Sequence, residues 1–354
     1  MRRICLLAAF ILILDCAHTP SSTLLAASAP SAQLISPWDA IPVSATSGPY
    51  DCAPPSLIAP DIMVTKGLNN NSLSPAVKEA AYPESSTALR DLTARTVAAA
   101  DAFRDSGNRG AARCAITLLA SAAADHAMAG YMASSDAAQE QSVALRSVAI
   151  AYLKVRGTGT ASPDEEALIH AWFEDIAQQE RAGIKDGPCP QGMCFAHGHH
   201  GIAAVLADAA VAIASNDQKL FAWSLSQYRD AVRQIDGHGM LPADTHGQYA
   251  LKFNLLSAAC LAQIAELGEV NGVDLYGYDK GRIGILIHTV SRGLIDPGPF
   301  LKATGSVQNI PSTIQPWEVI WASQYNRRFP DPVLAGLLQQ AGPAGADMWG
   351  GEPL

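Results

Sequence analysis

Eight stretches of the chain place apolar residues at the three-to-four spacing that marks one face of an α-helix. They are Thr87–Asp105, Arg113–Met128, Gln139–Val155, Pro163–Arg181, Gly201–Ala214, Leu220–Ile235, Tyr249–Glu269 and Lys280–Leu294. Hydrophobic residues make up 49% of the chain but aromatic residues only 6%, so the apolar content is mainly Ala, Leu, Val and Ile. Alanine favours helix because it loses no side-chain entropy there. No stretch shows the alternation of paired strands, and we predict an all-α fold.

Capping and turn residues divide these apolar runs. Ser162-Pro163-Asp164-Glu165 is typical of a helix start, with a capping serine, proline at the first helical position and acids in the first turn. Asn216-Asp217, Asp236-Gly237 and Asn271-Gly272 mark turns between runs. Because short loops join antiparallel neighbours, the pattern predicts helical hairpins arranged as an (α/α) toroid or incomplete barrel.

The chain divides into three parts by composition. Residues 1–29 have the features of a signal peptide, residues 30–75 are rich in Pro, Ser and Asn and are expected to be irregular, and residues 76–345 form the helical toroid domain.

The signal-peptide prediction rests on two arginines followed by a short apolar run. The run Ile4–Leu14 is too short to span a membrane as a stable helix. We expect cleavage in the small-residue stretch Ala26–Ala32 and a periplasmic or secreted product that is not integral to the membrane. A lipid anchor on Cys16 is the less favoured alternative, because Asp15 stands where a small residue is expected.

Five cysteines lie beyond the signal segment, which suits two disulfides and one free thiol in an oxidising compartment. Cys189 and Cys194 flank a loop-like stretch and are expected to pair, which leaves Cys52 and Cys114 for a long-range bridge. Cys260 lies in an apolar helical run and is expected to be buried. A zinc site using Cys189 and Cys194 is an alternative that lacks a second close thiol pair.

The net charge of −9, without any run of Lys or Arg, argues against nucleic acid as a partner. A polyanionic ligand would therefore require cations gathered locally in a cleft, because the overall field repels it.

Two segments combine polar, chemically active residues with a predicted helix start. The first, residues 195–201, places His197, His199 and His200 within four positions. The second, residues 241–254, contains His246 and Tyr249. Helix starts favour anions through their backbone N–H groups and the helix dipole. The alternatives are solvated or capping histidines, or a metal site completed by His246 or His238.

Several short segments occur in the order and spacing of a known family. They are Tyr50-Asp51-Cys52-Ala53-Pro54-Pro55, Arg113-Cys114-Ala115, Ala151-Tyr152-Leu153-Lys154-Val155-Arg156, Ala171-Trp172-Phe173, Leu220-Phe221-Ala222-Trp223, Gln234-Ile235-Asp236, Gly239-Met240-Leu241-Pro242 and Asn271-Gly272-Val273-Asp274-Leu275. In these the chain resembles the mannuronate-specific alginate lyases, which are helical toroids. The resemblance implies a polysaccharide lyase acting on a polyuronate.

The resemblance weakens at the family's catalytic signature. An Asn-Asn-His run at a helix start, followed by an Arg and a Tyr, is typical of these lyases; the Asn, Arg and His hold the substrate carboxylate and the Tyr carries the proton. In this chain the family His falls on His200, or on His197 in another register. The Arg position falls on His246 and the Tyr position on Phe253. Phenylalanine cannot carry a proton, and neutral histidine is a weaker anion partner than arginine.

From these observations we predict a periplasmic lyase that cleaves alginate (polymannuronate) or a related polyuronate by β-elimination, a reaction that needs no cofactor and no metal. The expected catalytic residues are His200, His197, Tyr249 and His246, and the expected substrate-binding residues are His199, Lys252, Gln248 and Asn254. Two rivals remain: a non-catalytic member that binds exopolysaccharide, and a metal-assisted lyase or hydrolase for another acidic polymer. The partner is an acidic polysaccharide, and we expect a monomer.

Overall fold

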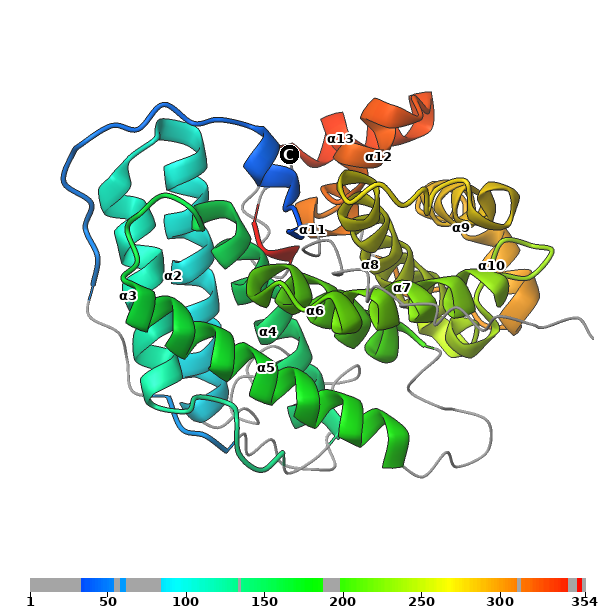
Figure 1. The fold of residues 1–354 in the computed structure, drawn as a ribbon. Helices are drawn as coiled ribbons and strands as arrows, with labels where there is room; N and C mark the ends of the chain where they lie inside the picture. The colour runs from blue at the N-terminus through cyan, green and yellow to red at the C-terminus, as the bar shows by residue number, and fades with distance from the viewer. Residues whose placement is uncertain are drawn as a thin grey trace, which may run out of the picture. The chain divides into compact units, whose positions relative to one another are not determined.

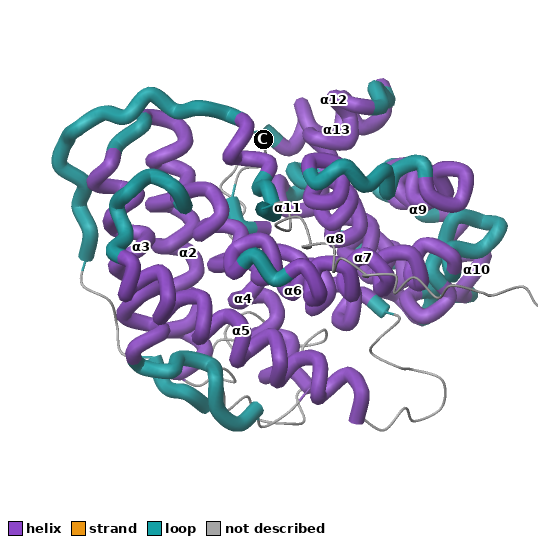
Figure 2. Tube along the Cα trace, viewed as in Figure 1, coloured by secondary structure: helices purple, strands orange, loops and turns teal. Residues whose placement is uncertain are grey.

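The computed structural model describes residues 33–53, 58–61, 84–132, 135–186, 198–310, 313–342 and 349–351. Within these ranges the regular structure is helical, and an isolated β-bridge pairs Thr46 with Asn108 (Figures 1 and 2). The all-α prediction is therefore confirmed. The predicted signal peptide lies outside the described residues, as do Cys189, Cys194 and His197.

The longer helices match the eight predicted runs in order. They are α2 (Glu84–Ser106), α3 (Arg109–Ala124), α4 (Ser135–Val155), α5 (Pro163–Asp186), α6 (His199–Ser215), α7 (Gln218–Arg233), α8 (Ala250–Val270) and α9 (Tyr278–Gly293). Short helices follow: α10 (Gly298–Thr304), α11 (Pro316–Val319), α12 (Ala322–Arg328) and α13 (Pro332–Ala341).

The largest difference from prediction is in α3, which was expected at Arg113–Met128. It begins earlier because the Asn108 side chain caps it by accepting from the Gly110 N–H. It ends earlier because His126 and Met128 adopt positive φ values of 51° and 50°, which an α-helix does not contain. Apolar spacing alone does not show such a break.

Helix α6 is the most enclosed element. It packs against α4 and α8, and α5 and α7 also cover it (Figure 1). Every residue from Gly201 to Ala214 is buried, which explains why this segment is apolar on all sides. Helix α8 is long and apolar enough to cross a membrane, yet 78% of its apolar window is buried within the protein, so its composition is that of a core helix.

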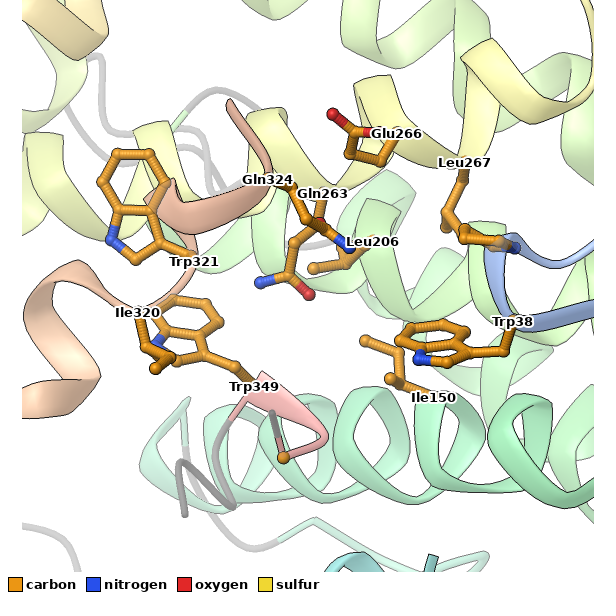
Figure 3. Close-up of a pocket in the computed structure, with 12 residues that line it drawn as sticks. Trp38, Ile150, Leu206, Gln263, Glu266, Leu267, Ile320, Trp321, Gln324 and Trp349 are labelled. Atoms are coloured by element: carbon orange, nitrogen blue, oxygen red, sulfur yellow. The ribbon is translucent and has the colours of Figure 1, made fainter. Parts of the chain in front are cut away.

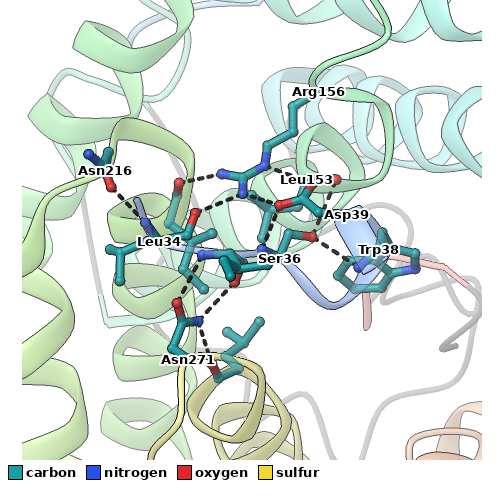
Figure 4. A network of polar contacts seen from close by, with 11 residues as sticks. Leu34, Ser36, Trp38, Asp39, Leu153, Arg156, Asn216 and Asn271 are labelled. Carbon is teal, nitrogen blue, oxygen red and sulfur yellow. Dashed lines mark hydrogen bonds and ion pairs between the residues drawn. The ribbon is translucent and has the colours of Figure 1, made fainter. Parts of the chain in front are cut away.

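The segment before α2 ties the ends of three core helices together (Figure 4). Its backbone N–H groups at Leu34 and Ile35 donate to the side chains of Asn216 and Asn271, which follow α6 and α8. Arg156, after α4, donates to the Leu34 carbonyl and pairs with Asp39. The turn asparagines therefore have a second function, which is to hold this irregular segment.

Three tryptophans lie together near the C-terminal ends of α4 and α8 (Figure 3). Trp38, Trp321 and Trp349 surround a cavity of about 20 Å³ that Gln263 and Gln324 also line. That volume holds about one water molecule, so this cavity does not admit a saccharide.

The structure confirms the disulfide between Cys52 and Cys114 and the burial of Cys260 as a free thiol. The disulfide joins the segment before α2 to α3 across 62 positions of sequence. Closing a loop of this length restricts the unfolded chain.

Removing this disulfide is expected to lower the free energy of unfolding by about 2–4 kcal/mol, because the unfolded state regains the entropy of the open loop. The measurement is urea unfolding of the Cys52→Ser, Cys114→Ser double variant beside the unmodified protein, both under oxidising conditions. An unchanged midpoint and slope would contradict the expectation. Cys260→Ser is the control for loss of a thiol that forms no bridge.

Candidate functional site

The start of α6 and the loop leading into α8 meet at one carboxylate. Asp244 lies in a 3-10 turn, Pro242–Asp244, and only 1% of its side chain is exposed. Its Oδ1 accepts hydrogen bonds from the His199 backbone N–H at 3.0 Å and pairs with His199 Nδ1 at 2.8 Å. Its Oδ2 accepts from the Ser257 hydroxyl at 2.6 Å.

Asp244 takes the place of an N-cap for α6. Gly198, the residue at the cap position, has no side chain to satisfy the first N–H groups, and an added Cβ would lie 3.1 Å from Asp244 Oδ1. Glycine therefore leaves room for a carboxylate from another element, which the helix dipole also favours. The arrangement fixes His199 at both its backbone and its ring.

Hydrogen bonding at Nδ1 determines what the His199 ring can do. When Asp244 is ionised it accepts, so Nδ1 carries the proton and Nε2 of the neutral ring presents a lone pair. A histidine oriented by a buried carboxylate is an arrangement suited to general base catalysis.

The His199 ring lies in an aromatic cluster centred on Phe253. The two rings stack with centroids 4.3 Å apart and an interplanar angle of 7°. His200 contacts His199 edge-on at 4.2 Å, while His246 and Tyr249 lie 5.5 and 5.9 Å from the Phe253 ring. Three of the predicted site residues thus contact Phe253, and the fourth, His200, contacts His199.

The loop that carries His246 and Tyr249 is held by residues after α10. Gln308 donates to the Gly247 carbonyl and accepts from the Leu251 N–H, and the Asn309 N–H donates to the Gln248 carbonyl. The Asn309 side chain donates to the Tyr249 hydroxyl at 3.2 Å. These bonds fix the phenol close to the start of α8 and were not predicted from the sequence.

The other three predicted substrate-binding residues, Asn254, Lys252 and Gln248, differ in their exposure to solvent. Asn254 is fully buried; it accepts from the Leu241 N–H and donates to the Thr245 hydroxyl and the Ala250 carbonyl. The earlier assignment is therefore corrected: Asn254 shapes the 241–245 loop and does not face a ligand. Lys252 is exposed, with its Nζ 5.6 Å from the centre of the Trp317 ring. Gln248 is exposed at the loop surface.

Asp244 and Ser257 are the site residues that sequence reasoning did not select. The sequence signal that could have pointed to Asp244 is an acid in Leu241-Pro242-Ala243-Asp244, close before a predicted helix. Such a carboxylate can accept a hydrogen bond from a histidine ring and so fix its orientation. Only the approach of α6 to α8 in the structure shows which histidine forms a hydrogen bond with this carboxylate. The same approach favours His199, which had been expected to bind substrate, as the oriented ring.

Burial keeps His200 neutral. The pKa of its imidazole is lowered from 6.5 to about 4, chiefly by desolvation and further by His199, while Asp244 opposes the shift. His200 therefore cannot neutralise a substrate carboxylate at neutral pH. Within the described part of the chain, no group of three or more His, Cys, Asp or Glu side chains is arranged to hold a metal ion.

The His200 pKa has a consequence for stability. Between pH 6.5 and about 4 the unfolded chain binds a proton at this residue and the folded chain does not. The free energy of unfolding is thus expected to fall as pH drops through this window, by on the order of 3 kcal/mol from this group. His200→Gln should remove that loss, as measured by urea unfolding between pH 7 and 4.

His288→Gln is the matched control for this experiment, because His288 is exposed on α9 and should follow the unmodified protein. Comparing variants at each pH is necessary, since burial raises the pKa of the Asp208 carboxyl to about 7 and acts in the opposite direction. Equal pH dependence in His200→Gln and the unmodified protein would disprove the His200 assignment.

The fold and this site define a helical-toroid protein with a histidine oriented by a buried carboxylate, and the comparisons with known proteins agree. The Alginate lyase family model matches residues 42–300, and the chain belongs to that family. Structures of alginate lyase A1-III share the fold: the 1.78 Å structure from Sphingomonas species A1 has a TM-score of 0.74 at 19% identity, covering 91% of this chain and 90% of that one. The toroid prediction is confirmed.

Curated relatives are similar at lower coverage. The alginate lyase of Azotobacter chroococcum is 30% identical over 206 residues, which are 56% of this chain and 54% of that protein. The chain thus spans about half the length of several curated relatives it matches. A polysaccharide lyase of Stenotrophomonas maltophilia is 29% identical over 287 residues, covering 79% of this chain and 82% of the relative.

Proposed function

We propose that this protein is a polysaccharide lyase that cleaves alginate or a related polyuronate by β-elimination. The observation that carries the proposal is the His199 ring, which buried Asp244 orients and which packs on the same Phe253 ring as Tyr249, in a chain of the alginate lyase family. Export to the periplasm or medium and a preference for mannuronate belong to the same proposal; the predicted signal peptide and the sequence resemblance support them.

The chemistry requires removal of the proton at C5 of the uronate and protonation of the leaving oxygen at C4. His199 Nε2 is the candidate base, since its other nitrogen is held by Asp244. Tyr249 is the candidate proton donor to the leaving oxygen, because its hydroxyl is positioned by Asn309. The C5 proton ends on His199, the C5–C4 double bond forms, and the C4–O bond breaks.

Charge on the substrate carboxylate must also be balanced, because it opposes carbanion formation. His246 stands where the family has arginine, and histidine carries a charge only when protonated. Exposed Lys252, in the first turn of α8, is a second candidate for this role. Because His246 stands at the arginine position, we expect a lower kcat than that of family members with arginine there.

Two structures of relatives support the binding part of the proposal. Alginate lyase A1-III was solved with tetrasaccharide in a histidine-to-alanine variant and in a tyrosine-to-phenylalanine variant. A toroid of this kind therefore holds an oligosaccharide without the tyrosine hydroxyl. Phe253, which aligns with the family tyrosine, is compatible with saccharide binding on that ground.

The test is the ultraviolet absorbance of the unsaturated uronate product. The purified protein is incubated with polymannuronate, polyguluronate and a glucuronate polymer, with His199→Ala as the control for a contaminating lyase. A rise with one polymer that His199→Ala abolishes supports the proposal and identifies the substrate. No product from any polymer would disprove lyase action on these substrates.

A second candidate is a non-catalytic protein that binds acidic exopolysaccharide. The observation in its favour is Phe253, which stacks on His199 where the family places a proton-carrying tyrosine. Binding of polymannuronate by calorimetry without any unsaturated product would favour this candidate over the enzyme.

A further inference from the structure

A second pocket lies at the other end of α6 from His199. It has a volume of about 320 Å³, at the lower end of the range for small-molecule sites. Its lining comes from the segment before α2, the end of α2, the start of α3, and the end of α4 with the residues that follow it.

This pocket is separate from the histidine site. Arg156 in its wall donates to the carbonyl of Ile213, near the C-terminal end of α6, whereas His199 begins that helix. Fourteen residues at 1.5 Å each place the two regions about 20 Å apart. The pocket therefore does not extend the cluster around Phe253.

The charge of the pocket is opposite to that of the chain. Four cations and one carboxylate line it, in a protein whose net charge is −9. Two cations are already balanced, since Arg156 pairs with Asp39 (Figure 4) and Lys154 pairs with Asp101 behind the wall. The positive charge available to a ligand comes from Arg104 and Arg109.

These two arginines differ in burial and in hydrogen bonding to the protein. Arg104 is half-buried and donates to the Ile41 carbonyl at 2.8 Å, which anchors it at the pocket wall. Arg109 is exposed, and its guanidinium has no hydrogen bond or ion pair with any residue that the structure describes. A cation focused over apolar walls of Trp38, Phe103 and Leu153 attracts anions more strongly than a cation on an open surface.

We propose that this pocket binds the oxyanion of a small acidic ligand through Arg109 and Arg104, with the carboxylate of a uronate sugar as the favoured source. Arginine presents two parallel N–H donors to a carboxylate or a phosphate, so both groups share the chemistry. The uronate is favoured because the apolar wall suits the carbon face of a sugar ring, which inorganic phosphate lacks. The proposal stands whether or not the histidine site is catalytic.

The test is calorimetric titration of the full chain with dimannuronate, with inorganic phosphate and with neutral cellobiose. Arg109→Ala is expected to weaken dimannuronate binding at this site by about tenfold or more, and Arg109→Glu further, because a charge-assisted hydrogen bond is lost. Tighter binding of dimannuronate than of phosphate identifies the sugar acid as the source, and the reverse identifies phosphate. Cellobiose should not bind here.

Arg327→Ala is the matched control, since Arg327 is an exposed arginine on α12 remote in sequence from the pocket. It should bind both anions like the unmodified protein, and thermal unfolding should show that all variants fold. Cleavage of polymannuronate should be unchanged in Arg109→Ala, which separates this site from the proposed lyase site. Equal affinity of Arg109→Ala and the unmodified protein for both anions would overturn the proposal, as would loss of cleavage in that variant.

Discussion

Asp244→Asn is expected to lower kcat for polyuronate cleavage by about 10²- to 10⁴-fold, the range found when the carboxylate that orients a catalytic histidine loses its charge. The amide presents N–H donors as well as an oxygen, so it no longer enforces the tautomer with the proton on Nδ1 of His199. The measurement is steady-state kinetics from the absorbance of the unsaturated product. KM should change little, because Asp244 is buried and cannot contact the polymer.

Ser257→Ala is the matched control for Asp244. It removes one hydrogen bond to the carboxylate but keeps its charge and its contact with His199, so kcat should fall by about tenfold at most. Both variants should retain their thermal unfolding transition. If Asp244→Asn keeps full kcat while remaining folded, His199 is not oriented for catalysis and the proposed base is wrong.

Tyr249→Phe is expected to lower kcat by a similar factor of about 10²–10⁴, because the leaving oxygen loses its proton donor. The ring and its packing against Phe253 are kept, so binding of an oligosaccharide measured by calorimetry should persist. Activity of Tyr249→Phe equal to that of the unmodified protein would exclude the phenol from the reaction.

A double variant that moves the hydroxyl from position 249 to position 253 tests whether the phenol itself is required. In the double variant Tyr249→Phe, Phe253→Tyr a hydroxyl returns at the position of the family tyrosine, on the ring stacked against His199. Recovery of cleavage in the double variant would show that a phenol at either position serves the reaction. Asn309→Ala is a milder control: it removes the amide that positions the Tyr249 hydroxyl, and should reduce kcat less than loss of the hydroxyl itself.

The helical part of this fold was predictable because helix packing leaves a local trace. Residues that face a neighbour recur every three to four positions, and the cap at Ser162 and the turns at Asn216 and Asn271 are satisfied within a few residues. The early end of α3 was not predictable, because left-handed residues at His126 and Met128 interrupt a run whose apolar spacing continues.

Only part of the candidate site could be predicted from the sequence, because the rest depends on contacts between residues far apart in the chain. Three histidines in four positions, and His246 with Tyr249 before a helix, were distinctive enough to select from composition and spacing. Which histidine is oriented was decided by Asp244, 45 positions away from His199 along the chain. The sequence alone does not show whether an asparagine such as Asn254 faces a ligand or lies in the core. The buried hydrogen bonds of Asn254 show that it lies in the core.

The sequence by itself determined the helices, their order and the long-range disulfide, because local periodicity and the small number of cysteines constrain those features. The tertiary structure decided the Asp244–His199–Ser257 contact, the burial that lowers the His200 pKa, and the cationic pocket between α2, α3 and α4. The physical reason is that hydrogen bonds, desolvation and charge focusing depend on distances between residues far apart in the chain, and periodicity along one helix does not contain those distances.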